Sequence, residues 1–386
     1  MTAFRRTGLR PVAALAAVAV LVAACGGGGD DAADSTTTDA PAAATTTEPE
    51  ATTTTERSST TSSTEAETTT STTIPPTPRE PLTGAEIASF DDIDPRPALA
   101  VKINNHPAAR RNHSGLGAAD IVFEELVEGT ITRFAAVFHS QGSDPVGPIR
   151  SGRSQDVDLL TSFREPLFAW SGGNPGVTRL IADSTLTDLN PFRNRSASGA
   201  YYRGPGSAPH NFYSSTDRLW ALTPEDHPGP PPQQYRYLET DEEFEGEAVS
   251  SFDLDIGSID VTWEWNAEQG AWLRSQEGSP HDDVVHGRID AANVIVMITE
   301  YRPSRIDARS PEAQTIGNGP VYVFSDGEVI EGRWQREFSG FAIEWVDADG
   351  EIIELTPGPT WIELAPAVPT LDVANPSTDI EIRYAD

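Results

Sequence analysis

The sequence predicts an α+β fold, in which a first domain of α/β type with a mixed sheet precedes a mostly β second domain. In residues 83–226, short apolar runs that fit buried strands alternate with segments of helical spacing. In residues 248–386, alternating runs are separated by turn-forming pairs, and no segment has the length of a convincing helix. A proline-rich and then acidic stretch, residues 227–247, is expected to link the two domains.

Residues 1–24 have the pattern of a secretory signal peptide. Arg5, Arg6 and Arg10 form a positive start, and the apolar run 12–24 that follows has 13 residues. This length suits a signal sequence and falls short of the roughly 20 residues that a membrane-spanning helix needs. The run ends in Leu-Val-Ala-Ala before Cys25, which resembles a lipobox.

Cys25 is the only cysteine of the chain, so no internal disulfide can form and the thiol is free for a thioether-linked lipid. A diacylglycerol supplies two acyl chains, which is enough for stable anchoring in a membrane. We therefore expect lipidation at Cys25 and a position on the extracytoplasmic face of the cell membrane. The alternative is an ordinary cleaved signal peptide with an unrelated cysteine beside it.

Residues 25–82 are expected to form a disordered tether. After a run of glycines, the segment consists almost entirely of Thr, Ser, Ala, Glu, Asp and Pro. Such a composition has too few large apolar side chains to offset the entropy lost on ordering, and it resembles an O-glycosylated stalk. A flexible coil of this length would hold the folded part on the order of 40 Å from the membrane.

The formal net charge of −32 is concentrated in the second half of the chain. Residues 91–220 contain 13 basic and 14 acidic residues, whereas residues 221–386 contain 9 basic and 34 acidic residues. An acidic surface of this kind repels nucleic acid and anionic lipid. We therefore expect no nucleic-acid partner, and membrane contact through the lipid anchor alone.

The first domain is expected to begin with a buried strand at 98–103 and a hairpin formed by 120–127 and 131–139. Glu128-Gly129-Thr130 separates the two hairpin strands.

A two-residue loop at Gly129-Thr130 would place Glu124, Glu128 and Arg133 on one face, with the arginine diagonal to both acids. This face is either a polar site or a solvated surface that carries a weak ion pair.

Arg150, Ser151 and Arg153 precede a segment of helical spacing that begins near Ser151 or Ser154. Free N–H groups at a helix start, together with two guanidinium groups, can bind a phosphate or carboxylate. The alternative is ordinary capping by serine, with the arginines paired to nearby acids such as Asp156.

Two later segments add candidate residues to this site. Gly172 and Gly173 lie between a predicted strand and a predicted helix, which is where α/β folds bind ligands, although glycine pairs are also common in turns. His210 can act as a general acid or base near neutral pH. Together with Asn211, it could instead satisfy buried backbone groups.

The second domain is expected to consist of hairpins and buried strands. Residues 259–275 alternate around a turn, and 293–299 is a continuous apolar run fit for a buried strand. Residues 321–334 and 341–355 each contain two strand-like runs around an Asp-Gly pair. Its tryptophans could stack on sugar rings, but the core is the commoner place for them.

His281, Asp282 and Asp283 with His286 have residue types that bind metals. The spacing puts the two histidines on opposite faces of a strand and no further ligand is evident, so a polar loop is favoured. The chain contains no nucleotide-binding fingerprint, GxSxG motif or HExxH motif. We expect no metal and no cofactor.

Several segments carry a resemblance to a known protein family. In the first domain these are IVFEELVEGTITRF, VGPIRSGR, the Ser-Gly-Gly loop at 171–173 and APHNFY. After residue 250 they are NVIVMITEY, GPVYVFSDGEVIEGRW and GPTWIEL. Together they resemble the YerB lipoprotein family, which is defined by two domains of unknown function. The resemblance covers essentially everything beyond the tether and implies a two-domain envelope lipoprotein. It brings no catalytic mechanism, so it assigns no catalytic residue.

Three functions fit these observations. The favoured one is binding of an anionic cell-envelope ligand, a cell-wall component or a partner protein in an arginine-rich cleft of the first domain. The second is an enzyme that modifies an envelope glycan or phosphate, with Glu124, Glu128 or His210 moving the proton, in a layout parallel to the LytR–CpsA–Psr transferases. The third is a structural scaffold between membrane and wall.

Binding is favoured over catalysis because no nucleophile stands beside an evident base and orienting group. The residues carry no signal for an oligomeric state.

Overall fold

The computed structural model describes residues 77–367 and 380–385, which belong to one compact unit that spans residues 73–386. The signal peptide, Cys25 and nearly all of the tether lie outside the described residues. Within the described part, no helix is long and apolar enough to cross a membrane.

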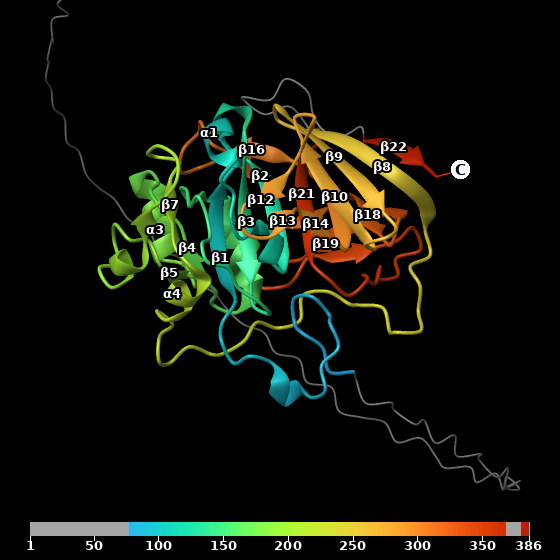
Figure 1. The fold of residues 1–386 in the computed structure, drawn as a ribbon, viewed down its shortest axis with the longest axis horizontal. Coiled ribbons are helices and arrows are strands. Elements are labelled where there is room, and N and C mark those ends of the chain that lie inside the picture. The colour runs from blue at the N-terminus through green and yellow to red at the C-terminus, as the bar shows by residue number, and fades with distance from the viewer. Residues whose placement is uncertain (1–76, 368–379, 386) are drawn as a thin grey trace, which may run out of the picture. The chain divides into compact units, whose positions relative to one another are not determined.

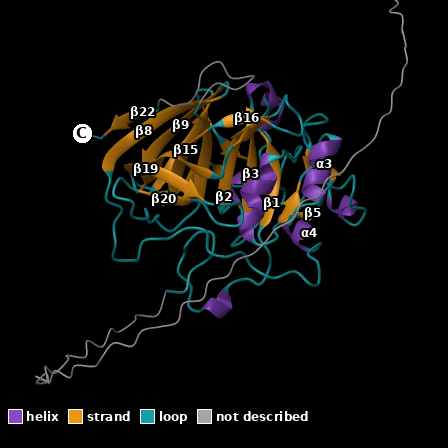
Figure 2. Cartoon of the chain, turned by 180° about the vertical axis from the view of Figure 1, so that it is seen from behind, coloured by secondary structure: helices purple, strands orange, loops and turns teal. Residues whose placement is uncertain are grey.

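The described first half, residues 77–226, combines short helices with short strands, and Figure 2 shows the helices around β1 and β5. The α-helices are α1 (Pro107–Arg110), α2 (Gln155–Leu160), α3 (Pro175–Ala182) and α4 (Thr216–Trp220). The 3-10 turns are η1 (Phe90–Asp92), η2 (Leu116–Ala118), η3 (Glu128–Thr130), η4 (Thr161–Phe163) and η5 (Ala197–Ala200). The strands are β1 (Leu99–Asn104), β2 (Ile121–Leu126), β3 (Thr132–Phe138), β4 (Leu167–Ala169), β5 (Thr187–Asp188), β6 (Tyr202–Arg203) and β7 (Phe212–Tyr213).

From residue 227 onward the described residues contain strands and no helix (Figure 1). The longer strands are β8 (Glu247–Ile256), β9 (Ile259–Asn266), β10 (Ala271–Gln276), β15 (Asn293–Thr299), β18 (Gly317–Ser325), β19 (Glu328–Arg336), β21 (Thr360–Pro366) and β22 (Glu381–Tyr384). The shorter ones are β11 (Ser279–Pro280), β12 (Asp282–Asp283), β13 (Gly287–Arg288), β14 (Asp290–Ala291), β16 (Tyr301–Pro303), β17 (Pro311–Ala313) and β20 (Glu344–Val346). The α+β prediction, with a mostly β second half, is confirmed.

One sheet runs through both halves in the order β11-β10-β9-β8-β19-β18-β15-β21-β2-β3-β1-β4-β5. The halves meet where β2 pairs in parallel with β21, from Ile121 opposite Thr360 to Glu124 opposite Glu363. In the first half, β1, β4 and β5 are parallel neighbours. The carboxyl ends of β1 and β4 therefore lie side by side, which is where ligands commonly bind in such sheets.

Aromatic side chains fill the core of the second half. Phe252 of β8 stacks on Phe324 of β18 with ring centroids 3.7 Å apart, and Trp263 of β9 packs edge-on against Trp361 of β21 at 5.5 Å. Strands β8–β10 thus form a second layer over β15, β18 and β21. Trp272 and Trp334 are also buried, whereas Trp265 is partly exposed. The expectation that most of these tryptophans belong to the core is confirmed.

The segment between the halves packs against the body of the protein. Before β8 begins it forms no helix or strand, but Tyr235, Tyr237 and Phe244 are buried. The hydroxyl of Tyr237 donates a hydrogen bond to the carbonyl oxygen of Leu82 at 2.8 Å. Residues 227–246 therefore contribute aromatic side chains to the core as well as connecting the two halves.

The β2–β3 hairpin has a register one residue away from the predicted one, because its loop contains three residues, Glu128–Thr130. Gly129 adopts φ +76°, a conformation that glycine reaches without strain. Glu125, in place of Leu126, therefore lies opposite Arg133. Since a one-residue shift moves side chains to the other face, Glu124 and Arg133 lie on opposite faces, and the predicted shared face is wrong.

Residues 341–355 contain less strand than predicted. The only strand there is β20, and an isolated bridge between Val346 and Ile352 replaces the expected second strand. The hairpin around Asp326-Gly327 forms as expected, with both turn residues at positive φ.

Candidate functional site

Arg150 is held between the ends of two parallel strands. Its N–H donates a hydrogen bond to the carbonyl oxygen of Lys102 in β1 at 2.8 Å, and its carbonyl oxygen accepts one from the N–H of Ser171, just after β4, at 2.9 Å. Asn104, the last residue of β1, pairs with Arg133 at the start of β3. The backbone thus brings residues from three separate segments to one edge of the sheet.

Six basic side chains gather at this edge, and we call them the basic cluster: Arg133, Arg150, Arg153, Arg203, His106 and His210. Burial lowers the pKa of Arg133, and the charges of Arg153 and Arg150 lower it further, although the charges of Glu128 and Asp156 oppose the shift. Burial also lowers the pKa of Arg150, and the charges of Arg153 and Arg203 lower it further. Because guanidinium groups stay charged in proteins, these arginines repel one another across a short distance.

Two of these arginines, Arg133 and Arg150, form no ion pair with any residue that the structure describes. Within the described residues, the half-buried side chain of Arg150 has no hydrogen bond and no carboxylate within ion-pair distance. Arg133 is 6% exposed; its Nη1 donates to the carbonyl oxygen of Ser151 at 2.8 Å, while its Nε is buried without an acceptor. The Ser151 hydroxyl also has no hydrogen-bond partner among the described residues.

Arg153 is the cluster arginine that has an acidic partner. Its Nε donates to the Glu128 carboxylate at 2.9 Å, and its Nη2 donates to the same oxygen. Glu128 also accepts a hydrogen bond from the hydroxyl of Ser310 in the second half. Burial raises the pKa of Glu128, but the hydrogen bond and charge of Arg153 outweigh this and lower it below its ordinary value. Glu128 therefore fixes Arg153 in place.

His210 stacks on His106 with ring centroids 4.3 Å apart. Burial lowers the pKa of His210, and the charges of His106, Arg150 and Arg133 lower it further, so the ring is neutral at pH 7. The side-chain amide nitrogen of Asn104 lies 2.7 Å from Nδ1 of His210. Because an amide nitrogen donates, Nδ1 accepts and the proton resides on Nε2.

The glycine loop lies against the arginine loop. Gly172 has φ +80°, and a Cβ added to it would lie 3.4 Å from the Ser151 hydroxyl oxygen. A Cβ at Gly173 would lie 3.0 Å from the ring of Trp170. Gly172 therefore suits the positive φ of the loop beside Ser151, whereas Gly173 leaves room for the ring of Trp170.

Asn211 supports the cluster from outside it. Its amide nitrogen donates to the carbonyl oxygen of Gly206 at 3.2 Å, which helps to close the β6–β7 hairpin. Its carbonyl oxygen accepts from Nη1 of Arg203 at 3.0 Å. Asn211 thus orients one arginine of the cluster.

Glu124 belongs to a different network on the opposite face of the sheet. It is fully buried and forms an ion pair with Arg274 of β10 at 2.5 Å. The structure thus brings together Arg133, Arg150, Ser151, Arg153, Gly172, Gly173, Glu128 and His210, with Asn211 beside them, and leaves Glu124 apart.

Three further residues at the basic cluster were not predicted from the sequence as site residues, namely Asn104, His106 and Arg203. A polar turn directly after a buried strand is the one signal that could have drawn attention to Asn104 and His106. The described part of the chain has one pocket lined by residues from 233 to 353 and another lined by residues from 238 to 354. No residue of the basic cluster lines either pocket. The predicted cleft is therefore neither of these pockets.

His281 and His286, which have a residue type that binds metals, lie apart. His281 is 2% exposed and hydrogen-bonds to the Arg274 guanidinium, whereas His286 is exposed and lies 3.0 Å from the Ser143 hydroxyl. In residues 77–367 and 380–385, no group of three or more His, Cys, Asp or Glu side chains is placed to hold a metal ion.

Comparison with known proteins identifies relatives along most of the folded chain. Residues 82–229 match the N-terminal domain, and residues 252–362 the C-terminal domain, of the family described as "Protein of unknown function (DUF3048)". The Bacillus subtilis (strain 168) protein named "Putative lipoprotein YerB" is 30% identical over an alignment of 311 residues that covers 77% of this chain and 88% of that protein. The crystal structure of YerB from Bacillus subtilis is similar with a TM-score of 0.64 and 28% identity, over 76% of this chain and 97% of that one. This chain therefore belongs to the YerB-like lipoprotein family, which these two domains define.

Proposed function

We propose that this protein is anchored at the extracytoplasmic face of the membrane through Cys25 and binds an anionic component of the cell envelope at the basic cluster. The lipobox-like sequence and the lipoprotein family support the anchor. Arg150 supports the binding role most strongly, because its half-buried guanidinium has no acidic partner among the described residues.

An unpaired, partly buried charge is costly, and adjacent like charges add to that cost. Arg150 stands beside two further arginines, and the Nε of Arg133 is buried without an acceptor. A bound anion would remove the repulsion and fill the missing acceptor positions at once. The stability lost in the empty protein is therefore recovered on binding.

A phosphate or carboxylate suits this arrangement. Guanidinium groups bind such oxygens through parallel, charge-assisted hydrogen bonds. The free hydroxyl of Ser151 and the Nε2–H of His210 add neutral donors that do not increase the repulsion. All of these groups donate, as an anion requires.

A catalytic role has less support from the same residues. The Nδ1 of His210 faces the amide of Asn104, and no described serine or cysteine hydrogen-bonds to this histidine as a nucleophile would. Glu128 is engaged by Arg153 and Ser310, so it is not free to accept a proton from a substrate.

Replacing Arg150 by glutamine tests the proposal. Thermal unfolding of the full-length chain is followed at low ionic strength with increasing inorganic phosphate or pyrophosphate, and with acetate for comparison. We expect at least one of these anions to raise the unfolding temperature of the wild type by mass action, and R150Q to lose most of that increase. The matched control R383Q removes an exposed arginine of β22 and should keep the full response.

A second prediction concerns the stability of R150Q in the absence of any anion. R150Q should be at least as stable as the wild type in the absence of anions, since the repulsion from Arg153 and Arg203 is removed. An R150Q protein that responds to all three anions as the wild type does would contradict the proposal.

A further inference from the structure

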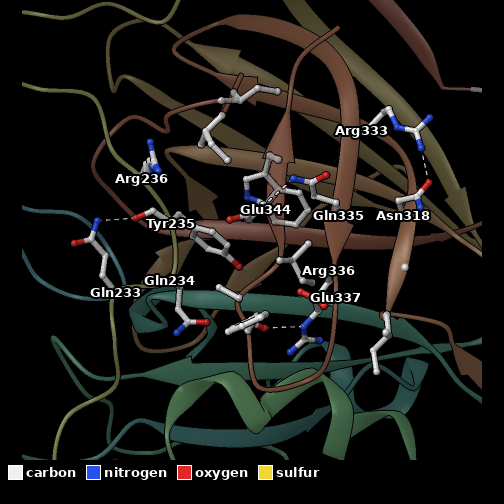
Figure 3. A pocket seen from close by; sticks show the side chains of 18 residues that line it. Gln233, Gln234, Tyr235, Arg236, Asn318, Arg333, Gln335, Arg336, Glu337 and Glu344 are labelled. Atoms are coloured by element: carbon white, nitrogen blue, oxygen red, sulfur yellow. Dashed lines mark hydrogen bonds between the residues drawn. The ribbon is translucent and has the colours of Figure 1, made fainter. Parts of the chain in front are cut away.

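A pocket of about 930 Å³ lies between residues 233–236 and the strands β18, β19 and β20 (Figure 3). We propose that this pocket, which we call the connector pocket, binds an uncharged saccharide. Its volume falls in the range of small-molecule sites. It shares no residue with the basic cluster, so this second site stands independently of the proposed anion binding.

The floor of the connector pocket is aromatic and carries an unused hydroxyl. Tyr235 is 7% exposed and its ring lies 5.6 Å from that of Trp345. In Figure 3 the Tyr235 side chain extends into the space between the connecting segment and the strands. Its hydroxyl has no hydrogen-bond partner among the described residues, and burial raises its pKa, so it remains a neutral donor and acceptor.

The rim of the pocket carries hydrogen-bond donors and acceptors, and its exposed positive and negative side chains are equal in number. The exposed Arg236 and Arg333 stand with the exposed Glu337 and Glu344, and three exposed amides belong to the same lining: Gln233, Asn318 and Gln335. A fourth amide, Gln234, is buried and already hydrogen-bonded to Ser162. The guanidinium of Arg333 donates a hydrogen bond to the side-chain oxygen of Asn318. Arg236 has no side-chain partner in the described part of the chain.

The third arginine of the lining is already occupied by the protein. Arg336 is 3% exposed and donates from Nε to the carbonyl oxygen of Phe341 at 2.8 Å and from Nη2 to that of Ser339 at 2.7 Å. Its charge therefore holds the loop after β19 in shape. Among the exposed side chains of the lining, two arginines and two glutamates cancel, so the charged groups that a ligand can reach have no net charge.

These features together match a saccharide better than other small ligands. Sugar hydroxyls both donate and accept, so they can use guanidinium, carboxylate and amide groups side by side. An apolar ligand would leave the Tyr235 hydroxyl and the rim groups buried without partners. The half-exposed ring of Phe341, at 51%, offers a face for the C–H side of a sugar ring.

The test uses soluble neutral oligosaccharides, namely maltotetraose, cellotetraose and chitotetraose, with the full-length chain in isothermal titration calorimetry. We expect at least one of them to bind with a dissociation constant in the millimolar range or tighter. Tyr235→Phe removes one hydrogen bond and should weaken that affinity about tenfold. Arg236→Ala should weaken it as well, whereas the matched control Tyr384→Phe, which removes a half-exposed hydroxyl on β22, should leave it unchanged.

Two results would overturn the inference. One is the absence of binding by all three oligosaccharides at millimolar concentration. The other is binding that survives in both Y235F and R236A, because the saccharide would then occupy another place. Inorganic phosphate should not compete with the saccharide, since the two sites share no residue, so each proposal can fail without the other.

Discussion

Arg274 and Arg150 are the same side chain in opposite electrostatic situations. Arg274 is fully buried, forms an ion pair with Glu124 at 2.5 Å and lies 3.7 Å from Glu363. Arg150 is half-buried among other arginines and has no acidic partner within the described residues. The contrast separates a charge that joins the two halves of the protein from a charge that is available to a ligand.

The network of Arg274 is balanced within itself. Burial raises the pKa of Glu363 well above its ordinary value, and the nearby charge of Glu124 raises it further, so Glu363 is a neutral carboxyl beside the Arg274–Glu124 ion pair. His281 lies between Arg274 and His113, at 2.7 Å from the guanidinium and 2.8 Å from the second ring. Burial lowers the pKa of His113 to about 4, and burial also lowers the pKa of His281 well below its ordinary value, so both rings are neutral at pH 7.

The largest effect should come from removing the paired arginine. Arg274→Met leaves Glu124 buried without its partner, and we expect the free energy of unfolding to fall by about 3–5 kcal/mol. Urea denaturation measures this change. The double variant with Glu124→Gln should recover a large part of it, because no uncompensated charge then remains. If the single variant loses less than about 1 kcal/mol of unfolding free energy, the buried pair contributes no more than an exposed one, and the contrast drawn here is wrong.

Asp120 provides an intermediate case, a buried carboxylate with hydrogen bonds but no cation. Burial raises its pKa to about 6, although hydrogen bonds from Ser140 and from the N–H of His139 oppose the shift, and Glu80 adds to it. A raised folded-state pKa means that its contribution to stability is complete below about pH 4 and is lost as the pH rises through about 6.

The difference in stability between wild type and Asp120→Asn should therefore depend on pH. Relative to the variant, the wild type should lose up to about 3 kcal/mol between pH 4 and pH 7. Urea denaturation at each pH measures the difference. A constant difference across this range would show that Asp120 keeps an ordinary pKa.

The smallest effect sets the lower end of the comparison. Arg383 pairs with Asp253, but its side chain is 47% exposed. Arg383→Gln should change the free energy of unfolding by no more than about 1 kcal/mol, because water and salt screen an exposed pair. A loss as large as that of Arg274→Met would mean that burial does not decide the value of a paired arginine here.

The strands were predictable from the sequence because their patterns are local. The continuous apolar run at 293–299 became β15, and the alternation at 259–275 became β9 and β10. The register of the β2–β3 hairpin was not predictable, because one additional loop residue at Glu128 exchanges the faces of all the side chains that follow.

The arginine site was partly predictable. The closeness of Arg150 and Arg153 in sequence, next to a helix start, predicted two of its members. Arg203 and His106 join them only through the β6–β7 hairpin and the turn after β1. Glu124, which was predicted to lie beside Arg133, instead pairs with Arg274, 150 residues further along the chain.

The sequence by itself determined the kinds of strand, the concentration of acidic residues in the second half, and the family to which the chain belongs. Only the tertiary structure decided that Arg274 has a carboxylate partner and that the half-buried Arg150 has none among the described residues. Pairing depends on distances of a few ångströms between residues far apart in the chain, and on which side of a strand each one faces. Composition and spacing do not contain either quantity.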